Sequence, residues 1–352
     1  MTRKDFLSAV GASAAMSVLP SALATEDGKK RTKAVLLHLG ANMWCDWVPD
    51  GQDDSHLKGQ ARPERALSLD EAVFHRVTEY AAARGMNMVV LDIGEALVYP
   101  SHPELAVQGS WTPDRMRTEI ARLRGLGLEV IPKLNFSNTH NGWLKGLRRQ
   151  VSTPAYYAAC SDVIRDVVEI FDRPRMLHLG YDEETAGHQA ALDFVAVRKG
   201  ELWWHDFLWF VGVTEKLGVR PWVWSDYGWH HPEYVKRCPK SVMQSNWYYD
   251  EDLGGFSLDQ AKNRYWDILQ LYIDLEKAGF EQIPCGSNWL SSKHKANGRI
   301  VNESMVPLMD YCRERIAPER LKGFMMASWA FCKPGKEESF IRAGIDLVAD
   351  RM

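Results

Sequence analysis

The feature that most constrains the fold of this chain is a regular alternation of short apolar runs with longer segments of helical periodicity. Buried parallel strands have the length and the apolar, β-branched character of these runs. The runs occupy residues 34–39, 88–92, 130–134, 176–180, 221–224, 241–244, 282–285 and 324–327. Eight strands that alternate with helices over about 315 residues predict an α/β fold, the (β/α)8 TIM barrel.

The segments between the runs predict the helices that a barrel needs. We expect helices at residues 68–85, 113–126, 154–171, 203–217, 258–278, 305–315 and 337–348, with a short helix near residue 233. An open doubly wound sheet would also alternate, but it seldom needs eight units, and no glycine-rich phosphate loop follows the first strand here. Residues 34–352 are therefore predicted to form a single barrel domain, without a second domain or a short-period repeat.

The N-terminus has the composition of an export signal. Arg3 and Lys4 precede an apolar stretch of small residues, and Ala22-Leu23-Ala24 is a cleavage site of the A-x-A type. Residues 1–24 are predicted to be a signal peptide, and residues 25–33 a linker. Lys4 stands where a twin-arginine signal has its second arginine, so we expect export to the periplasm or cell exterior by this route or by ordinary secretion. No later stretch approaches the ~20 apolar residues of a membrane span, so none is expected in the mature protein.

Composition narrows the classes of partner. The chain has 43 basic and 46 acidic residues, a formal charge of -3 and no basic stripe, which argues against a nucleic-acid partner. Its six cysteines show no C-x-x-C pair and no metal-ligand spacing, so we expect buried thiols, no metal and no other cofactor. The 14 tryptophans often stand beside strand ends, as they do in sugar sites, although core packing is the other interpretation.

Polar and aromatic side chains gather where the predicted strands end. The active site of a barrel of this kind lies at the carboxyl ends of its strands. Carboxylates among aromatic rings favour glycoside chemistry, in which an acid protonates the leaving oxygen and negative charge stabilises an oxocarbenium-like centre. The candidate residues are His38, Asp92, His140, His178, Asp182, Glu183, Trp224, Asp226, Trp247, Tyr248, Asp250, Trp289 and Trp329.

The fourth run ends in two adjacent carboxylates, Asp182 and Glu183. Successive strand residues point to opposite faces, so both acids can reach one substrate only if the chain has begun to turn at Tyr181. Gly180 makes such a turn easy. The alternative is that the two acids only cap the helix that follows, and a helix-start role is the expectation for Glu184.

These residues resemble a known family. His178-Leu-Gly-Tyr-Asp182-Glu183 is similar to the H-x-G-x-D-E motif of glycoside hydrolase family 20, the β-N-acetylhexosaminidases, and it falls on the fourth strand as in that family. Trp247-Tyr-Tyr-Asp250 resembles its W-Y-x-D motif, and Trp224 and Trp329 match its tryptophans at later strand ends. The resemblance implies an exo-acting hydrolase that takes terminal N-acetyl-β-D-hexosaminides from a glycan or oligosaccharide, without a cofactor.

The family mechanism implies a role for each matching residue. The substrate's own acetamido oxygen attacks C1, so no second carboxylate nucleophile is needed. Glu183 would be the general acid and then the base, Asp182 would hold the acetamido N–H, and Tyr248 would donate to the acetamido oxygen. Trp224, Trp247 and Trp329 would wall the acetamido pocket, and Asp250 would bind a sugar hydroxyl. His38, Asp92, His140, His178, Asp226 and Trp289 are the remaining candidate sugar contacts.

The sequence departs from the family pattern at two positions, and in the family both positions contact sugar hydroxyls away from the acetamido group. Many members have an arginine after the first strand, whereas this chain has Leu-His-Leu-Gly-Ala-Asn at residues 37–42. The glutamate that often follows the last tryptophan is Phe331 here. The first segment looks more like the compact hexosaminidase D branch, and these departures leave the identity of the sugar open.

Two other functions remain open at the level of sequence. A retaining glycosidase could use Glu183 as the acid and Asp226 or Asp92 as a nucleophile, which requires carboxyl groups ~5 Å apart across the scissile bond. An exported barrel could also bind carbohydrate through its aromatic rings without hydrolysing it.

Overall fold

The computed structural model describes residues 31–249, 266–289 and 302–351, and Thr32–Met352 forms one compact unit. Eight parallel strands make one sheet in the order β6-β5-β4-β3-β2-β1-β8-β7. The strands are β1 (Thr32–His38), β2 (Met88–Asp92), β3 (Glu129–Lys133), β4 (Met176–His178), β5 (Arg220–Trp224), β6 (Met243–Ser245), β7 (Cys285–Gly286) and β8 (Gly323–Phe331). The prediction of a (β/α)8 barrel is confirmed.

Backbone hydrogen bonds between β6 and β7 close the ring. Isolated bridges join Gln244 to Gln282 and Trp247 to Cys285. The amide of Cys285 donates to the carbonyl of Asn246 over 2.9 Å. Pairing therefore continues around all eight strands, as a closed barrel requires.

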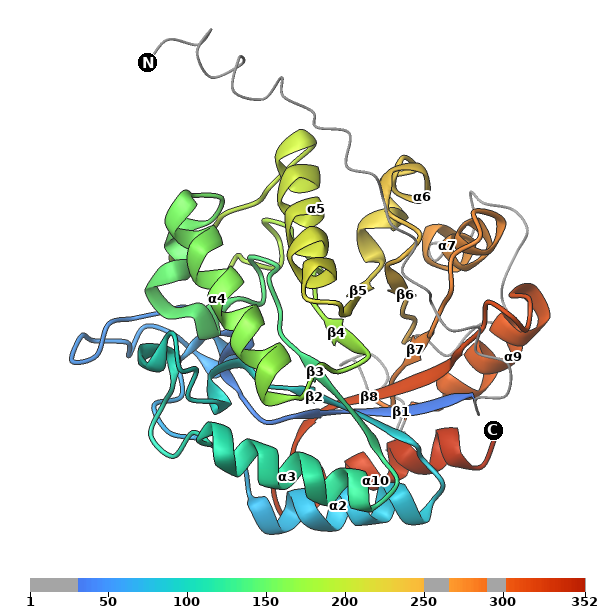
Figure 1. The fold of residues 1–352 in the computed structure, drawn as a ribbon, viewed down its shortest axis with the longest axis horizontal. Helices are drawn as coiled ribbons and strands as arrows, with labels where there is room; N and C mark the ends of the chain where they lie inside the picture. The colour runs from blue at the N-terminus through green and yellow to red at the C-terminus, as the bar shows by residue number, and fades with distance from the viewer. Residues whose placement is uncertain (1–30, 250–265, 290–301, 352) are drawn as a thin grey trace, which may run out of the picture. The chain divides into compact units, whose positions relative to one another are not determined.

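Helices follow the strands and pack outside them, as Figure 1 shows for α2, α3 and α10 below β1 and β2. Three helices begin at side-chain caps that satisfy their first free amides: Asp70 for α2, Thr112 for α3 and Thr153 for α4. The described helices are α2 (Glu71–Ala83), α3 (Pro113–Gly125), α4 (Pro154–Ile170), α5 (Glu201–Lys216), α6 (Tyr234–Arg237), α7 (Trp266–Lys277), α9 (Met305–Arg315) and α10 (Lys336–Ala349).

Alternation along the strands divides the core into two layers. Outward side chains of β1, such as Val35 and Leu37, pack in the large cluster between strands and helices. Inward side chains, such as Ala34 and Leu36, join a smaller cluster inside the barrel. Because the side-chain period of a strand is two residues, polar residues two positions further along can point into the same interior.

One row of paired residues lies at the carboxyl end of the barrel interior, and we call it the floor row. It consists of His38, Asp92, Lys133, His178 and Trp222, each the register partner of the next. All five residues are buried. Strand pairing alone therefore brings four polar side chains from β1 to β4 into one line.

Differences from the expected strand ends have local causes. β4 ends at His178, two residues early, because Gly180 and Tyr181 have φ of 71° and 80° and turn the chain. β8 runs on to Phe331 because the chain pairs with His38 again after a shift in register. The start of the helix expected over residues 258–278 lies outside the described residues, which contain it from Trp266.

Two expectations about the chemistry of the chain can be compared with the structure. All six cysteines are buried free thiols, as expected. Within the described ranges, none of the helices combines the length and apolarity that a membrane crossing requires.

The turn after β4 can be tested by a matched pair of glycine substitutions. A Cβ at Gly180 would lie 2.2 Å from Cγ of Asn135 on a backbone with φ of +71°, whereas Gly127 has φ of +83° and no atom within 4 Å of such a Cβ. We expect Gly127→Ala to cost about 1–2 kcal/mol from its left-handed backbone. Gly180→Ala should cost at least about 1–3 kcal/mol more, because overpacking is added. Urea denaturation measures both, and equal losses would contradict the close approach of Asn135.

Candidate active site

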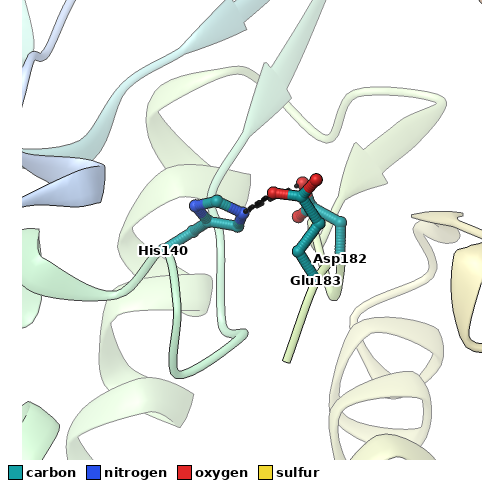
Figure 2. Close-up of side chains that lie close together, drawn as sticks. All are labelled: His140, Asp182 and Glu183. Atoms are coloured by element: carbon teal, nitrogen blue, oxygen red, sulfur yellow. Dashed lines mark ion pairs between the residues drawn. The ribbon is translucent and has the colours of Figure 1, made fainter. Parts of the chain in front are cut away.

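Asp182 and Glu183 lie side by side after β4, and both face the imidazole of His140. Nε2 of His140 is 3.3 Å from Oδ2 of Asp182 and 3.3 Å from Oε2 of Glu183. Figure 2 shows the two carboxylates converging on the same ring nitrogen. Asp182 and His140 are buried, whereas the Glu183 side chain is 29% exposed. One acid is therefore enclosed, and its neighbour remains open to solvent.

The turn expected at Tyr181 is present and brings both carboxylates to one side. Tyr181 and Glu183 have φ of 80° and 56°, a region that residues other than glycine seldom adopt. Oδ1 of Asn135 accepts from the Tyr181 amide over 3.1 Å, and Oδ2 of Asp226 accepts from the Glu183 amide over 2.8 Å. The Thr139 hydroxyl donates to the Glu183 carbonyl over 2.6 Å. These bonds stabilise a backbone that would otherwise relax.

Glu184 anchors the same turn and does not start a helix. The next helix, α5, begins at Glu201, so the helix-start role expected for Glu184 is wrong. Arg198 is buried and binds both carboxylate oxygens of Glu184. Arg198 also donates to Oδ2 of Asp206 over 3.0 Å and to the Tyr181 hydroxyl over 3.2 Å. Through its bond to Asp206 on α5, Arg198 fixes the segment after Glu183 against the barrel.

The charges of the central cluster are set by mutual contact. Burial alone would lower the pKa of His140, but the charges of Asp182 and Glu183 outweigh burial and raise it to about 10. Burial alone would raise the pKa of Asp182, but His140, Lys133 and the amide of Asn135, 2.8 Å away, hold it well below its ordinary value. Asp182 is thus a carboxylate and His140 an imidazolium at neutral pH.

Asp226 has the opposite protonation state. Burial of its carboxyl group, followed by the charges of Asp182 and Glu183, raises its pKa to about 8. Its Oδ1 is buried and has no hydrogen-bond partner among the described residues. A protonated carboxyl group can accept from the Glu183 amide with one oxygen and donate with the other.

The central cluster has the spacing of a metal site. One ligand atom each from His140, Asp182 and Glu183 lies within 4.8 Å of the others. A metal ion would have to displace a proton from His140, because the charges of Asp182 and Glu183 outweigh the effect of burial and raise the pKa of His140 to about 10. Without a metal ion, His140 is an imidazolium between two acidic side chains.

Rings from β5, β8 and the segment after β6 form an aromatic wall, which consists of Trp224, Trp247, Tyr249 and Trp329. Trp224 and Trp329 have centroids 6.0 Å apart, and those of Trp329 and Tyr249 are 6.3 Å apart. Tyr249 stacks on Trp247 at 4.8 Å. The wall belongs to the interior cluster of the barrel, so it supplies an apolar surface at the carboxyl end.

The structure places Tyr249, and not Tyr248, at the site. Tyr248 is buried in the outer cluster between strands and helices. Tyr249 points the other way, as alternation along an extended chain requires. Burial raises the pKa of Tyr249 well above its ordinary value, and the charges of Asp182 and Glu183 contribute to this shift. The hydroxyl role that the W-Y-x-D resemblance gives to Tyr248 therefore fits the position of Tyr249.

On the β1 side of the site, sequence reasoning missed two residues. Lys133 donates to Oδ2 of Asp92 over 2.8 Å, and Nδ1 of His38 lies 3.1 Å from the same oxygen. Lys133 could have been found by alternation, because it stands two positions after the inward Ile131. The ring centroid of Trp44 lies 5.3 Å from that of His38, but Trp44 follows β1 in the three-residue 3-10 helix Asn42–Trp44, which is too short to show a periodicity in the sequence.

The remaining candidates differ in their relation to the cluster. His178 is buried, its Nδ1 accepts from the Gly180 amide over 3.1 Å, and burial holds its pKa well below the ordinary value. Trp289 is 45% exposed, and no described ring contact joins it to the aromatic wall. Asp250 lies outside the described residues. His188 is half-exposed, and its Nε2 lies 3.5 Å from Oε1 of Glu183.

Comparison with known proteins finds similarity at the level of structure. No protein-family model matches the sequence, and the search of curated proteins finds no match. A β-N-acetylhexosaminidase from Bacteroides fragilis NCTC 9343 superposes with a TM-score of 0.61 at 12% identity, over 92% of this chain and 65% of that one. Dispersin B gives a TM-score of 0.56 at 12% identity, over 92% of this chain and 99% of its own.

A third structure is an exo-β-N-acetylglucosaminidase of glycoside hydrolase family 20 from Vibrio harveyi, solved in complex with N-acetylglucosamine. Its TM-score is 0.56 at 14% identity, over 91% of this chain and 54% of the Vibrio protein. This chain thus spans less than two thirds of the Bacteroides and Vibrio proteins. At these identities the likeness establishes a shared barrel fold.

The protonation of Asp226 predicts how stability depends on pH. A carboxyl group with a raised pKa stabilises the fold fully below its unfolded value, near 4, and this contribution is lost as pH rises through about 8. Asp226→Asn keeps a neutral group that can accept from the Glu183 amide. We expect wild type to lose stability relative to Asp226→Asn as pH rises across this window, in urea denaturation at several pH values. Parallel pH profiles of the two proteins would contradict a neutral Asp226.

Proposed function

We propose that this chain is an exo-acting β-N-acetylhexosaminidase of glycoside hydrolase family 20, which hydrolyses terminal N-acetyl-β-D-hexosaminides by substrate-assisted retention. The observation that carries the proposal is the turn after the fourth strand, which sets Asp182 and Glu183 side by side with His140 between them. The H-x-G-x-D-E resemblance falls on this same turn. Barrels of proteins named as β-N-acetylhexosaminidases, such as the one from Bacteroides fragilis, provide independent support through the shared fold.

The two acids suit different steps. Buried, charged Asp182 would hold the acetamido N–H and stabilise positive charge as the acetamido oxygen bonds to C1. More exposed Glu183 would first take a proton from the imidazolium of His140, whose Nε2 lies 3.3 Å from its Oε2. It would give this proton to the leaving oxygen as the glycosidic bond breaks, and then take a proton from the water that attacks C1. The aromatic wall would enclose the acetamido methyl group, and the Tyr249 hydroxyl would donate to the acetamido oxygen.

A mechanism with two carboxylates on opposite sides of the sugar fits less well. Oδ2 of Asp226 binds the backbone amide of Glu183 itself, and its raised pKa of about 8, caused first by burial, makes it a poor nucleophile at neutral pH. Asp92 is buried and engaged by Lys133 and His38 through one oxygen. The carboxyl groups of both candidate nucleophiles are therefore engaged by other protein groups. Substrate assistance needs no carboxylate nucleophile.

The proposal includes an exported enzyme that acts on carbohydrate outside the cytoplasm. Its basis is the signal-like sequence of residues 1–24, which precedes the described residues. Cell fractionation with and without residues 1–24 tests this part separately.

Glu183→Gln tests the assignment of the acid. With an aryl N-acetyl-β-hexosaminide that has a poor leaving group, we expect kcat/KM to fall at least about 100-fold, because general acid catalysis is lost. Binding of an N-acetyl thiazoline analogue, measured by calorimetry, should be retained. The control is Glu104→Gln, at an exposed position of the short 3-10 helix Pro103–Leu105. Full activity of Glu183→Gln would refute the assignment of Glu183 as the general acid. Efficient hydrolysis of matched substrates without the acetamido group would refute substrate assistance, and absence of any hydrolysis by wild type would favour a binding protein.

Tyr249→Phe and Tyr248→Phe form a matched pair for the hydroxyl donor. Loss of one preorganised donor to a developing charge costs about 10²–10³ in kcat. We expect a loss of this order for Tyr249→Phe and less than about threefold for Tyr248→Phe, because only Tyr249 belongs to the interior cluster. The reverse order would assign the donor to Tyr248, as the W-Y-x-D resemblance implies.

A further inference from the structure

A half-exposed histidine lies on the open side of the proposed acid. Nε2 of His188 is 3.5 Å from Oε1 of Glu183, and the His188 side chain is 50% exposed. The other carboxyl oxygen of Glu183, Oε2, faces the buried ring of His140. Glu183 therefore has a histidine next to each oxygen, one enclosed in the barrel and one at the surface.

A compact turn in the β4–α5 loop, residues 179–200, fixes the position of the His188 ring. The amide of His188 donates to the Thr185 hydroxyl over 3.1 Å, and Nδ1 of the ring lies 2.8 Å from the same hydroxyl oxygen. The Thr185 amide donates in turn to the Glu183 carbonyl over 2.7 Å. Thr185 thus connects the backbone of Glu183 with both the backbone and the ring of His188.

Buried contacts anchor the part of this loop that follows His188. Gln189 is fully buried, and its side-chain amide forms hydrogen bonds of 3.0 and 2.9 Å with the carbonyl and the amide of Ala196. Asp46 is also fully buried, and its Oδ2 accepts from the Phe194 amide over 3.1 Å. Because these anchors hold the loop against the barrel, the exposed His188 has a defined place beside the acid.

The place of His188 is the one that a leaving group would occupy. In the proposed reaction the leaving oxygen must lie against Glu183, because the acid gives it a proton. Asp182 and His140 are buried and fill the inner side of Glu183, so the ligand beyond the scissile bond must extend along the open side. In an exo-acting enzyme, the terminal sugar lies in the enclosed site and the rest of the glycan leads out past His188.

We propose that His188 contacts the sugar residue on the leaving-group side of the scissile bond and favours saccharide over aryl leaving groups. This inference rests on the proposed function, and it deepens that function by assigning the class of leaving group. An imidazole has a ring nitrogen that can bind a hydroxyl group in any of its protonation states. A sugar presents hydroxyl groups there, whereas a simple aryl group presents none. His188 is therefore a specificity-determining contact.

Two substrates with the same terminal sugar test this contact. One is a disaccharide, and the other is an aryl glycoside of the same N-acetyl-β-hexosamine. We expect His188→Ala to lower kcat/KM for the disaccharide at least about fivefold more than for the aryl glycoside, because one hydrogen bond to the leaving sugar is lost. His188→Gln should restore the ratio of the two values to within about twofold of wild type, because its amide also donates and accepts.

His56→Ala is the matched control for the structure of the loop. The His56 side chain is 51% exposed, and its Nε2 lies 2.7 Å from Oδ2 of Asp193 in the same loop. No described contact joins His56 to Glu183, so we expect the substrate ratio of His56→Ala to stay within about twofold of wild type. An unchanged ratio in His188→Ala, or the same change in both variants, would overturn a direct contact of His188 with the leaving sugar.

Binding without hydrolysis separates this inference from the proposed function. In the Glu183→Gln background, calorimetry compares the disaccharide with the methyl glycoside of its terminal sugar. Adding His188→Ala should weaken binding of the disaccharide at least about fivefold more than binding of the methyl glycoside. This result, together with a wild type that hydrolyses neither substrate, would refute the proposed function and leave the contact standing. Equal effects on both ligands would overturn the contact even in an active enzyme, and absence of binding of either ligand would overturn both.

Discussion

The site depends on one imidazolium that lies between two adjacent carboxylates. Without the positive charge of His140, the acidic side chains of Asp182 and Glu183 would repel each other in a partly buried position. His140 reaches both from the loop after β3, and Asn135 of the same loop binds Asp182. The loop after β3 therefore contributes to the difference between Asp182, which is charged and enclosed, and Glu183, which is more exposed.

The backbone of the acidic turn is as constrained as its charges. Gly180, Tyr181 and Glu183 all have positive φ, and each neighbouring element contributes a hydrogen bond or an ion pair that holds them. Arg198 closes this arrangement by binding Glu184 and the Tyr181 hydroxyl. The side chains after Glu183 look like ordinary loop residues in the sequence, yet they determine where the acid points.

Much of the fold could be predicted because strand and helix periods are local properties of sequence. The fourth strand, the turn at Tyr181 and the inward His38 and Asp92 follow from such patterns. The sequence does not show which of Tyr248 and Tyr249 points into the barrel. That depends on how the segment after β6 pairs with β7, as in the bridge between Trp247 and Cys285. The sequence also could not reveal Arg198 as the partner of Glu184, since their contact depends on the path of an irregular loop. Lys133 was overlooked because buried lysines are rare, although its position was predictable.

The composition of the barrel interior changes halfway around the ring. His38, Asp92, Lys133 and His178 come from β1 to β4, whereas Trp222, Trp224 and Trp329 come from β5 and β8. A ligand bound above this surface would have a hydrophilic half and an aromatic half beneath it, so its two ends would not be equivalent. The strands that hold the fold together would then also set the orientation of the ligand. The surrounding loops could differ without reversing that orientation.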